Sequence, residues 1–177
     1  MLPCELSIEQ IINSEDFVFI ADGVDSSVYR YQDKAIKIYD NGGFVLSFYT
    51  EIINKSSLYL NNNPKFFTLP SGDRIPITIN PIDCVREENG NFSTISPFVE
   101  GLNLIDLLNG EDCEDVFGME LLELKFRIMG IIRTIGKDLQ KNFDLSEFNI
   151  LAMNVKLTPN SIVITDFGLS IEDIKPI

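Results

Sequence analysis

Short apolar stretches separated by polar, turn-forming residues occur near the start of the chain, a pattern typical of short β-strands. Residues 17–21, 28–31 and 35–39 are mostly apolar, and each stretch contains at most one charged residue. The stretches between them, residues 22–27 and 32–34, are rich in turn-forming residues. This pattern predicts three short strands joined by turns.

The pattern then changes to the spacing of a helix over residues 43–60, and Asn61-Asn-Asn-Pro64 predicts its end. The apolar residues that we expect on its inward stripe are Phe44, Phe48, Ile52 and, more loosely, Leu58. Two or three further strands are predicted within residues 65–99, with turns at residues 71–73 and 88–90.

Helical spacing returns in the second half of the chain. A short helix is predicted over residues 104–108 and a longer one over residues 119–140. A hairpin is then predicted to join residues 149–153 to residues 161–165 through residues 156–160. The residues expected to point inward from the long helix are Leu122, Phe126, Met129, Ile132 and Ile135.

This order of elements predicts an α+β fold, with a β-rich first half and a helical second half that contains a hairpin. A length of 177 residues favours a single domain, residues 1–177. The one candidate boundary within it is residues 97–101, which separates residues 1–96 from residues 102–177.

The chain has 27 acidic and 14 basic residues, a formal net charge of −13. An acidic surface of this kind repels nucleic acid and anionic membranes, so we expect neither as a partner. The charge has a simpler interpretation as well, since it keeps a protein soluble.

Other residue types exclude several kinds of chemistry. The chain has no histidine, which excludes histidine-based triads, zinc–histidine sites and imidazole acid–base catalysis. Its cysteines, Cys4, Cys84 and Cys113, are odd in number and widely spaced, which favours free thiols in a reducing compartment. No apolar run approaches the roughly 20 residues of a transmembrane helix, and no signal peptide is apparent. We expect a soluble, cytoplasmic monomer.

Two acids and an amide near the end of the chain suggest phosphate chemistry. Asp144 precedes Asn149 by five residues, and Asp166 follows the apolar stretch 161–165 and begins the sequence Asp-Phe-Gly168. Phosphoryl transfer with Mg²⁺ requires an acid that orients the attacking hydroxyl and oxygen ligands for the metal. These residue types at this spacing are candidates for both roles.

Three features of the first half have a structural and a functional interpretation. Gly23 and the small residue Ser26 between two strands could admit phosphate oxygens, or could simply form a turn. Lys37 within an apolar strand could meet an anion, or could extend to the surface. Glu51 could pair with Lys37, or with Lys55 one helical turn away.

Taken together and in order, these pieces resemble the protein-kinase-like superfamily over nearly the whole chain. The phosphate loop corresponds to Ala21-x-Gly23-x-x-Ser26-x-Val28-Tyr29, and the strand lysine to Ala35-Ile-Lys37. Glu51 stands on the following helix, and the remaining motifs are Asp144-x4-Asn149-Ile-Leu and Asp166-Phe-Gly168. The resemblance implies a two-lobed kinase fold with residues 97–101 as the hinge.

The resemblance also implies roles for these residues. Gly23, Ser26 and Val28 would line the nucleotide, and Lys37, paired with Glu51, would bind the α- and β-phosphates. Asp144 would accept the proton of the substrate hydroxyl, while Asn149 and Asp166 would hold Mg²⁺. At the hinge, adenine would bond the carbonyl of Pro97 and the amide of Val99.

Several positions depart from the kinase pattern. Ala21 and Ser26 replace the flanking glycines of the phosphate loop, Asn142 and Phe143 replace the histidine and arginine before the catalytic aspartate, and Ser146 replaces a lysine. Nine residues follow Gly168, without an Ala-Pro-Glu motif. These departures bring the phosphotransfer rate into question, and we expect a truncated second lobe without later helices or an activation segment.

The shortened pattern resembles the minimal effector kinases that bacterial pathogens inject into host cells, including the OspG type and a plant-pathogen type that phosphorylates a host chaperone. It implies an ATP- and Mg²⁺-dependent Ser/Thr protein kinase that acts in virulence, in the host cytosol, on a host chaperone or ubiquitin-pathway protein. The alternatives are a pseudokinase that acts as an interaction module, a small-molecule kinase and a Bud32-like ATPase.

Overall fold

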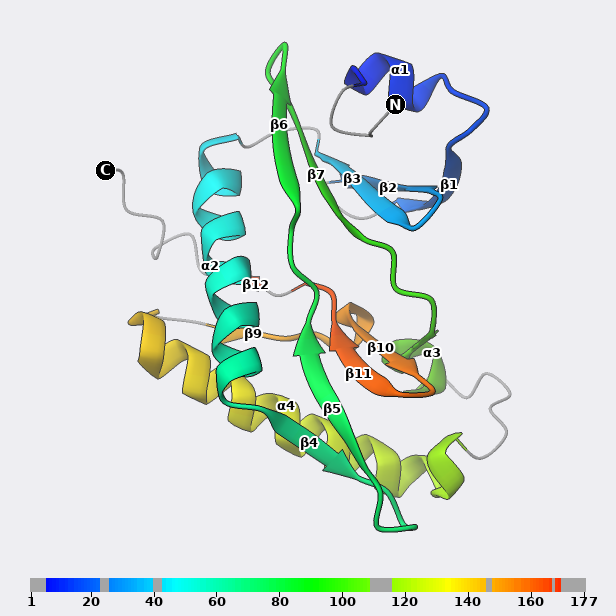
Figure 1. Cartoon of the computed structure of the whole chain (residues 1–177), viewed down its shortest axis with the longest axis vertical. Helices are drawn as coiled ribbons and strands as arrows, with labels where there is room; N and C mark the ends of the chain where they lie inside the picture. Colours follow the sequence, from blue (N-terminus) through cyan, green and yellow to red (C-terminus); the bar gives the residue numbers. More distant parts are fainter. Residues whose placement is uncertain are drawn as a thin grey trace. The chain divides into compact units, whose positions relative to one another are not determined.

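The computed structural model describes residues 6–22, 26–39, 43–108, 116–145, 148–166 and 168–169. These residues form two compact units, and each is built on its own five-stranded sheet (Figure 1). The first unit comprises the described residues of Met1–Asn54 and Pro81–Val99, and the second those of Lys55–Asn80 and Glu100–Ile177. The α+β class predicted from the sequence is confirmed.

The sheet of the first unit is antiparallel throughout. Asn89 and Gly90 have φ values of 53° and 80° at the turn between its last two strands in the chain. Positive φ at both central residues is the geometry that two-residue hairpins require, and it explains the Asn-Gly sequence. The strands, in spatial order, are β1 (Val18–Asp22), β2 (Ser26–Tyr31), β3 (Lys34–Tyr39), β7 (Asn91–Pro97) and β6 (Cys84–Glu88).

A short helix, α1 (Ile8–Ile12), completes the hydrophobic core of this unit. The helix begins at a capping box in which Ser7 and Gln10 satisfy each other's backbone amides. Its buried residues pack with Ile36, Ile38 and Ile95 of the sheet. Helix α1 was not predicted from the sequence, because five residues are too few to display a helical period.

Helix α2 spans Gly43–Asn62, as predicted from its apolar spacing. Ile52 is buried, but Leu58 is exposed, so the predicted inward stripe is wrong at Leu58. Leu58 follows Ile52 by six positions, which places the two side chains on different sides of a helix with 3.6 residues per turn. Leu60, which is buried, continues the inward side.

The sheet of the second unit has the order β4 (Lys65–Thr68), β5 (Arg74–Ile79), β11 (Ser161–Ile164), β10 (Val155–Thr158) and β8 (Leu102–Asn103). Its distinguishing feature is the parallel pairing of β5 with β11, in register at Ile77–Ile162 and Ile79–Ile164. Residues 1–96 were predicted to form the first lobe. The structure instead groups Lys55–Asn80 with the second unit, since β5 pairs with β11.

Helix α4 (Leu121–Phe143) follows the short helices α3 (Leu104–Leu108) and η2 (Val116–Gly118). The predicted inward positions are correct at Ile132 and Ile135 but wrong at Leu122 and Phe126, which are exposed. The buried stripe keeps a spacing of three or four residues along the whole helix, as one helical face requires. It consists of Leu124, Ile128, Ile132, Ile135 and Leu139.

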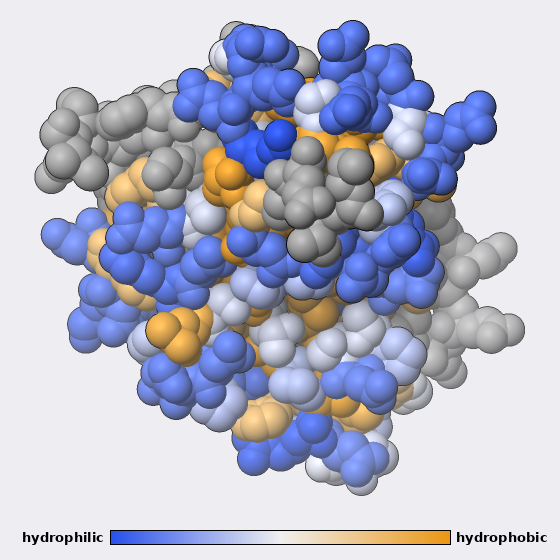
Figure 2. Space-filling view, turned by 45° about the horizontal axis from the view of Figure 1, so that its top comes forward, coloured by the Kyte–Doolittle hydropathy of each residue, from blue (hydrophilic) through white to orange (hydrophobic). Residues whose placement is uncertain are grey.

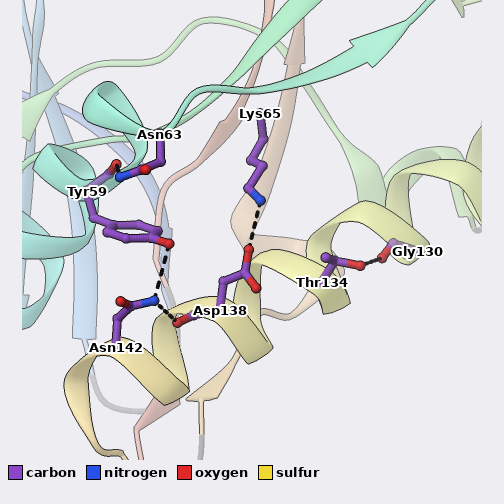
Figure 3. Close-up of polar contacts among 7 residues, drawn as sticks. All are labelled: Tyr59, Asn63, Lys65, Gly130, Thr134, Asp138 and Asn142. Atoms are coloured by element: carbon purple, nitrogen blue, oxygen red, sulfur yellow. Dashed lines mark hydrogen bonds and ion pairs between the residues drawn. The ribbon is translucent and has the colours of Figure 1, made fainter.

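Polar contacts join α4 to its neighbours within the second unit (Figure 3). Lys65 Nζ forms an ion pair with Asp138 Oδ2 at 2.8 Å, and Asn142 Nδ2 donates to the hydroxyl of Tyr59 at 3.2 Å. Both contacts lie in the C-terminal half of α4, and they orient the end from which the next segment begins.

The predicted hairpin near the C-terminus is present but shifted. Residues 149–153 do not form its first strand, because β9 (Phe148–Asn149) pairs with β12 (Gly168–Leu169) and η3 (Ala152–Asn154) follows. The hairpin strands are β10 and β11, joined through Pro159 and Asn160. The segment that the sequence suggested as the turn therefore contains most of the strand β10.

Hydrophilic side chains cover most of the face seen in Figure 2, with smaller apolar patches between them. Within the described ranges, no helix has the length and apolarity needed to cross a membrane.

Candidate functional site

Strand β3 presents Lys37 on the face of the sheet opposite the hydrophobic core. Side chains alternate along a strand, and Ile36 and Ile38 are both buried in the core. Lys37 therefore extends from the other face, directly between Val28 of β2 and Thr94 of β7. The structure thus brings Lys37 and Val28, two residues predicted to contact the nucleotide, side by side.

The turn between β1 and β2 is closed at its base by a side-chain hydrogen bond. The hydroxyl of Ser27 donates to Asp22 Oδ1 at 2.7 Å, and the two residues are cross-strand partners. Ser26, which begins β2, is buried and lies opposite Tyr39. Gly23 lies outside the described residues. The described part of the predicted phosphate loop is therefore a closed β-hairpin.

Lys37 is half-buried, and its ammonium lies 5.1 Å from the centroid of the Tyr39 ring. An aromatic ring face attracts a cation at this distance. Tyr39 follows Lys37 by two residues on the same strand, so both side chains extend from the same face. Lys37 accordingly lies against a ring at the surface of the sheet rather than extending freely into solvent.

The predicted hinge begins at the end of β7. Pro97 lies opposite Lys34 in the sheet, and the amide of Phe98 donates to the carbonyl of Asp33 at 2.6 Å. The guanidinium of Arg30 lies 4.2 Å from the centroid of the Phe98 ring. These contacts hold the chain against the sheet up to the residue before Val99, which is half-buried.

Glu51 lies on α2, in the part of that helix that belongs to the first unit. Its side chain is exposed. The ion pair between Glu51 and Lys37 stays a prediction.

In the second unit, Asp144 ends helix α4 in a left-handed conformation, with φ 52° and ψ 45°. Its amide donates to the carbonyl of Gln140, which also accepts from the amide of Leu145. Glycine usually occupies this position at a helix end, and aspartate is among the few other residues that tolerate it. The carboxylate of Asp144 is exposed. An acid in a strained conformation with an accessible carboxylate is a candidate functional residue.

Strands β9 and β12 bring the remaining predicted residues together. Asn149 is the cross-strand partner of Gly168, and Asp166 precedes Gly168 by two residues. Asp166 is half-buried and follows directly after β11 and Thr165. The backbone therefore places Asn149 opposite a residue that follows Asp166 by two positions, and the shared role of Asn149 and Asp166 stays a prediction.

The segment that carries Asp166 is supported from both sides. The amide of Thr165 donates to the carbonyl of Asn154 at 2.8 Å, and the amide of Asn80 donates to the carbonyl of Ile164, also at 2.8 Å. The hydroxyl of Ser57 in turn donates to the carbonyl of Ile79 at the end of β5. This support could not be predicted from the sequence, because a parallel strand pairing leaves no local signature.

The donor chemistry of Asp166 and Asn149 fits Mg²⁺, which prefers carboxylate and carbonyl oxygens and keeps several water ligands. In the parts of the chain that the structure describes, no three His, Cys, Asp or Glu side chains form a metal-binding group. The predicted ligand set does not require such a group, since one of its two members is an amide.

Two lysines on the sheet of the second unit have shifted pKa values. The hydrogen bond to Asp138 raises the pKa of Lys65 above its ordinary value of 10.5, with the negative charge of Asp138 adding to the effect and partial burial opposing it. Burial lowers the pKa of Lys156 below 10.5, and the charge of Asp106 opposes that shift.

No family model matches the sequence, and no curated protein matches it. Solved structures do match. The kinase domain of PknI from Mycobacterium tuberculosis aligns with 94% of this chain at 14% identity and a TM-score of 0.52 in a mutant form. A second structure of the same domain aligns with 93% of the chain at 14% identity and a TM-score of 0.51. The chain spans 64% of that kinase domain in both alignments.

A structure of Rad53 in complex with AMP-PNP also matches at 19% identity, and the alignment covers 89% of this chain and 39% of the chain in that structure. Its TM-score of 0.46 is too low to establish a shared fold. The two PknI alignments cover nearly the whole chain at an identity that reveals fold alone. The chain therefore has a protein-kinase-like fold.

Proposed function

We propose that this protein is an ATP- and Mg²⁺-dependent phosphotransferase. The observation that carries the proposal is the pairing of β9 with β12, which places Asn149 opposite Gly168, two residues from Asp166. The proposal is supported further by Lys37, which extends from the face of its sheet opposite the core, beside Val28.

Each residue has a role that follows from its chemistry. The ammonium of Lys37 is a compact cation suited to the α- and β-phosphates, and the tyrosine ring beside it limits the directions in which it can extend. Asp166 and Asn149 would hold Mg²⁺, which, when bound, neutralises charge on the phosphate oxygens. Glu51 would orient Lys37, and Gly23, Ser26, Val28, Pro97 and Val99 would contact the nucleotide.

Asp144 is the proposed acceptor of the proton from the attacking hydroxyl. Its carboxylate is exposed at the end of α4 and is thus accessible to a substrate. A positioned base of this kind contributes about 10²–10⁴-fold to the rate. Positioning and charge neutralisation would have to supply the remainder.

The substrate class is part of the proposal. We propose Ser or Thr of a protein substrate, because the motif set resembles protein kinases. The role as an injected effector that phosphorylates a host protein rests on the resemblance to minimal effector kinases.

A second candidate function is a non-catalytic, nucleotide-binding interaction module. It is favoured by Ala21 and Ser26 in place of two loop glycines, and by Ser146 in place of a cationic residue. Such a module would keep its binding function without Asp144 and Asp166.

Transfer of label from γ-labelled ATP distinguishes the two. The purified protein would be incubated with Mg²⁺, alone and with a eukaryotic lysate, beside Asp166→Asn and the control Asp73→Asn, an exposed turn acid of the same unit. We expect label on one or a few proteins, unchanged by the control and reduced on the order of 10³-fold by Asp166→Asn. Absence of label with the wild type would favour the interaction module, and undiminished label with Asp166→Asn would refute the proposed metal ligand.

A further inference from the structure

Helix α4 has an outer face that is both apolar and basic. We define the α4 outer face by Leu122, Phe126, Gly130, Arg133, Lys137 and Lys141. Residues four apart lie on the same side of a helix, so Leu122, Phe126 and Gly130 form one row, and Arg133, Lys137 and Lys141 form a second row that continues on the same side toward the C-terminal end. The stripe buried in the core lies on the other side of the helix.

The apolar row is unusually exposed. Leu122 is 62% and Phe126 is 67% exposed, the highest values for large hydrophobic side chains among the described residues. Because these two side chains, one helical turn apart, are mostly exposed, they contribute little buried apolar area to the stability of the fold. Exposed apolar side chains that lie close together on a surface mark interaction sites.

The basic row stands out in a protein with a net charge of −13. Arg133, Lys137 and Lys141 are exposed, and no described residue forms an ion pair with any of them. Both acids of α4 are engaged, since Glu123 pairs with Arg127 and Asp138 pairs with Lys65. The α4 outer face therefore carries uncompensated positive charge.

Gly130 lies at the centre of this face and leaves the helix backbone accessible. A side chain at this position would meet no atom within 4 Å, so the fold does not require glycine. Glycine in the middle of a helix is less favourable than alanine. The hydroxyl of Thr134 donates to the carbonyl of Gly130 at 3.0 Å, a contact within the helix itself (Figure 3). A glycine without a role in the fold permits a partner's backbone to approach closely.

We propose that the α4 outer face binds an amphipathic helix of a partner protein that carries apolar side chains toward one end of its contact face and Asp or Glu toward the other. The partner's apolar side chains would cover Leu122 and Phe126, and its acids would pair with Arg133, Lys137 and Lys141. Helices recognised in this way place anchors at i, i+3, i+4 and i+7. A protein is favoured over an anionic membrane, because the net charge of −13 opposes approach to a negatively charged surface. This inference does not depend on the proposed phosphotransfer.

A synthetic helical peptide with Leu toward one end of one face and Glu toward the other end of that face tests the proposal, beside the same peptide with Lys in place of Glu. Amide chemical shifts of the isotope-labelled full chain would locate the site, and fluorescence anisotropy would give the affinity. We expect the Glu peptide to perturb α4 amides selectively and to bind more weakly as salt is raised. The Lys peptide should not bind.

Two variants separate recognition from stability. Reversing charge in Arg133→Glu with Lys137→Glu should weaken binding of the Glu peptide about tenfold or more, which corresponds to about 1.4 kcal/mol. The matched reversal Lys55→Glu with Arg74→Glu, on α2 and β5, should change it far less. Gly130→Ala should raise the Tm of the protein by about 1–4 °C and yet weaken binding of the Glu peptide. A residue with a purely structural role would not do both.

Three results would overturn the proposal. The first is no binding of the Glu peptide, or binding that neither the α4 reversal nor Gly130→Ala changes. The second is α4-dependent binding to anionic phospholipid vesicles without binding to the peptide, which would assign the face to a membrane. The third is a concentration-dependent dimer in sedimentation that the α4 reversal abolishes, which would assign it to a second copy of the chain.

Discussion

The two five-stranded sheets place their candidate functional residues in different ways. In the first unit, β1, β2 and β3 are neighbours both in sequence and in space, and Lys37 takes its position from simple alternation along one strand. In the second unit, Asp166 follows β11, whose parallel partner β5 comes from residues more than 80 positions earlier. Local patterning therefore positions the cation, whereas a long-range pairing supports the carboxylate.

This difference explains what could be predicted from the sequence. The three early strands and the helix over residues 43–60 were predicted, because each depends on a period of two or of 3.6 within a short window. The pairing of β5 with β11 was not predicted. For that reason the grouping of Lys55–Asn80 with the second unit was not predicted either. Parallel strands far apart in sequence share no turn whose residues could reveal them.

Individual side chains show the same limit. Leu122 and Phe126 fit a helical period but not the buried one, and only the packed structure selects the stripe that contains Leu124 and Ile128. The hairpin before Asp166 was placed too early, because Asn149 pairs with Gly168 instead of entering the hairpin. The spacing of Asp144, Asn149 and Asp166 gave their candidate roles, but not the left-handed backbone of Asp144.

The largest expected effects concern the two cores. Ile36 and Ile77 are both fully enclosed, one in each sheet. Ile36→Ala and Ile77→Ala should each lower the free energy of unfolding by about 2–5 kcal/mol, since each leaves a cavity, while the matched Ile→Val changes should cost about 0.5–1.5 kcal/mol. Hydrogen exchange should locate the loss of protection in β2, β3 and β7 for Ile36→Ala, and in β5 and β11 for Ile77→Ala. If either variant reduced the protection of both sheets equally, the result would contradict the division of the described residues into two compact units.

The backbone at Asp144 offers a sharper comparison, because Lys37 lies on an ordinary strand whereas Asp144 has a φ of 52°. Asp144→Ala should lower the free energy of unfolding by up to about 1 kcal/mol, and Asp144→Gly should leave it unchanged or raise it by a similar amount. Both should lose phosphotransfer, since neither has a carboxylate. Urea unfolding and a transfer assay would measure the two effects. An active Asp144→Gly variant would show that the carboxylate is not the proton acceptor.

The smallest effect concerns the ion pair between Lys65 and Asp138, whose side chains are 35% and 36% exposed. At this exposure Lys65→Met should cost about 0.2–1 kcal/mol of unfolding free energy. Folding raises the pKa of Lys65, so the stabilisation is present below pH 10.5 and is lost as the pH rises through the folded-state value. Urea unfolding should show that the difference in unfolding free energy between wild type and Lys65→Met is smaller above pH 10.5 than at pH 7. A difference independent of pH would instead indicate that packing was lost. The control is Lys141→Met, which changes an exposed lysine on α4, the helix that carries Asp138.

The most direct test of the proposed site is the affinity for ATP with and without Mg²⁺, measured by calorimetry on the wild type, Lys37→Met, Asp166→Asn and the control Asp73→Asn. The account predicts that Mg²⁺ tightens ATP binding by the wild type and by Asp73→Asn at least about tenfold. Lys37→Met should weaken ATP binding under both conditions, and Asp166→Asn should abolish the increment that Mg²⁺ provides. An Asp166→Asn variant that retains the full Mg²⁺ increment would contradict the assignment of Asp166 as the metal ligand.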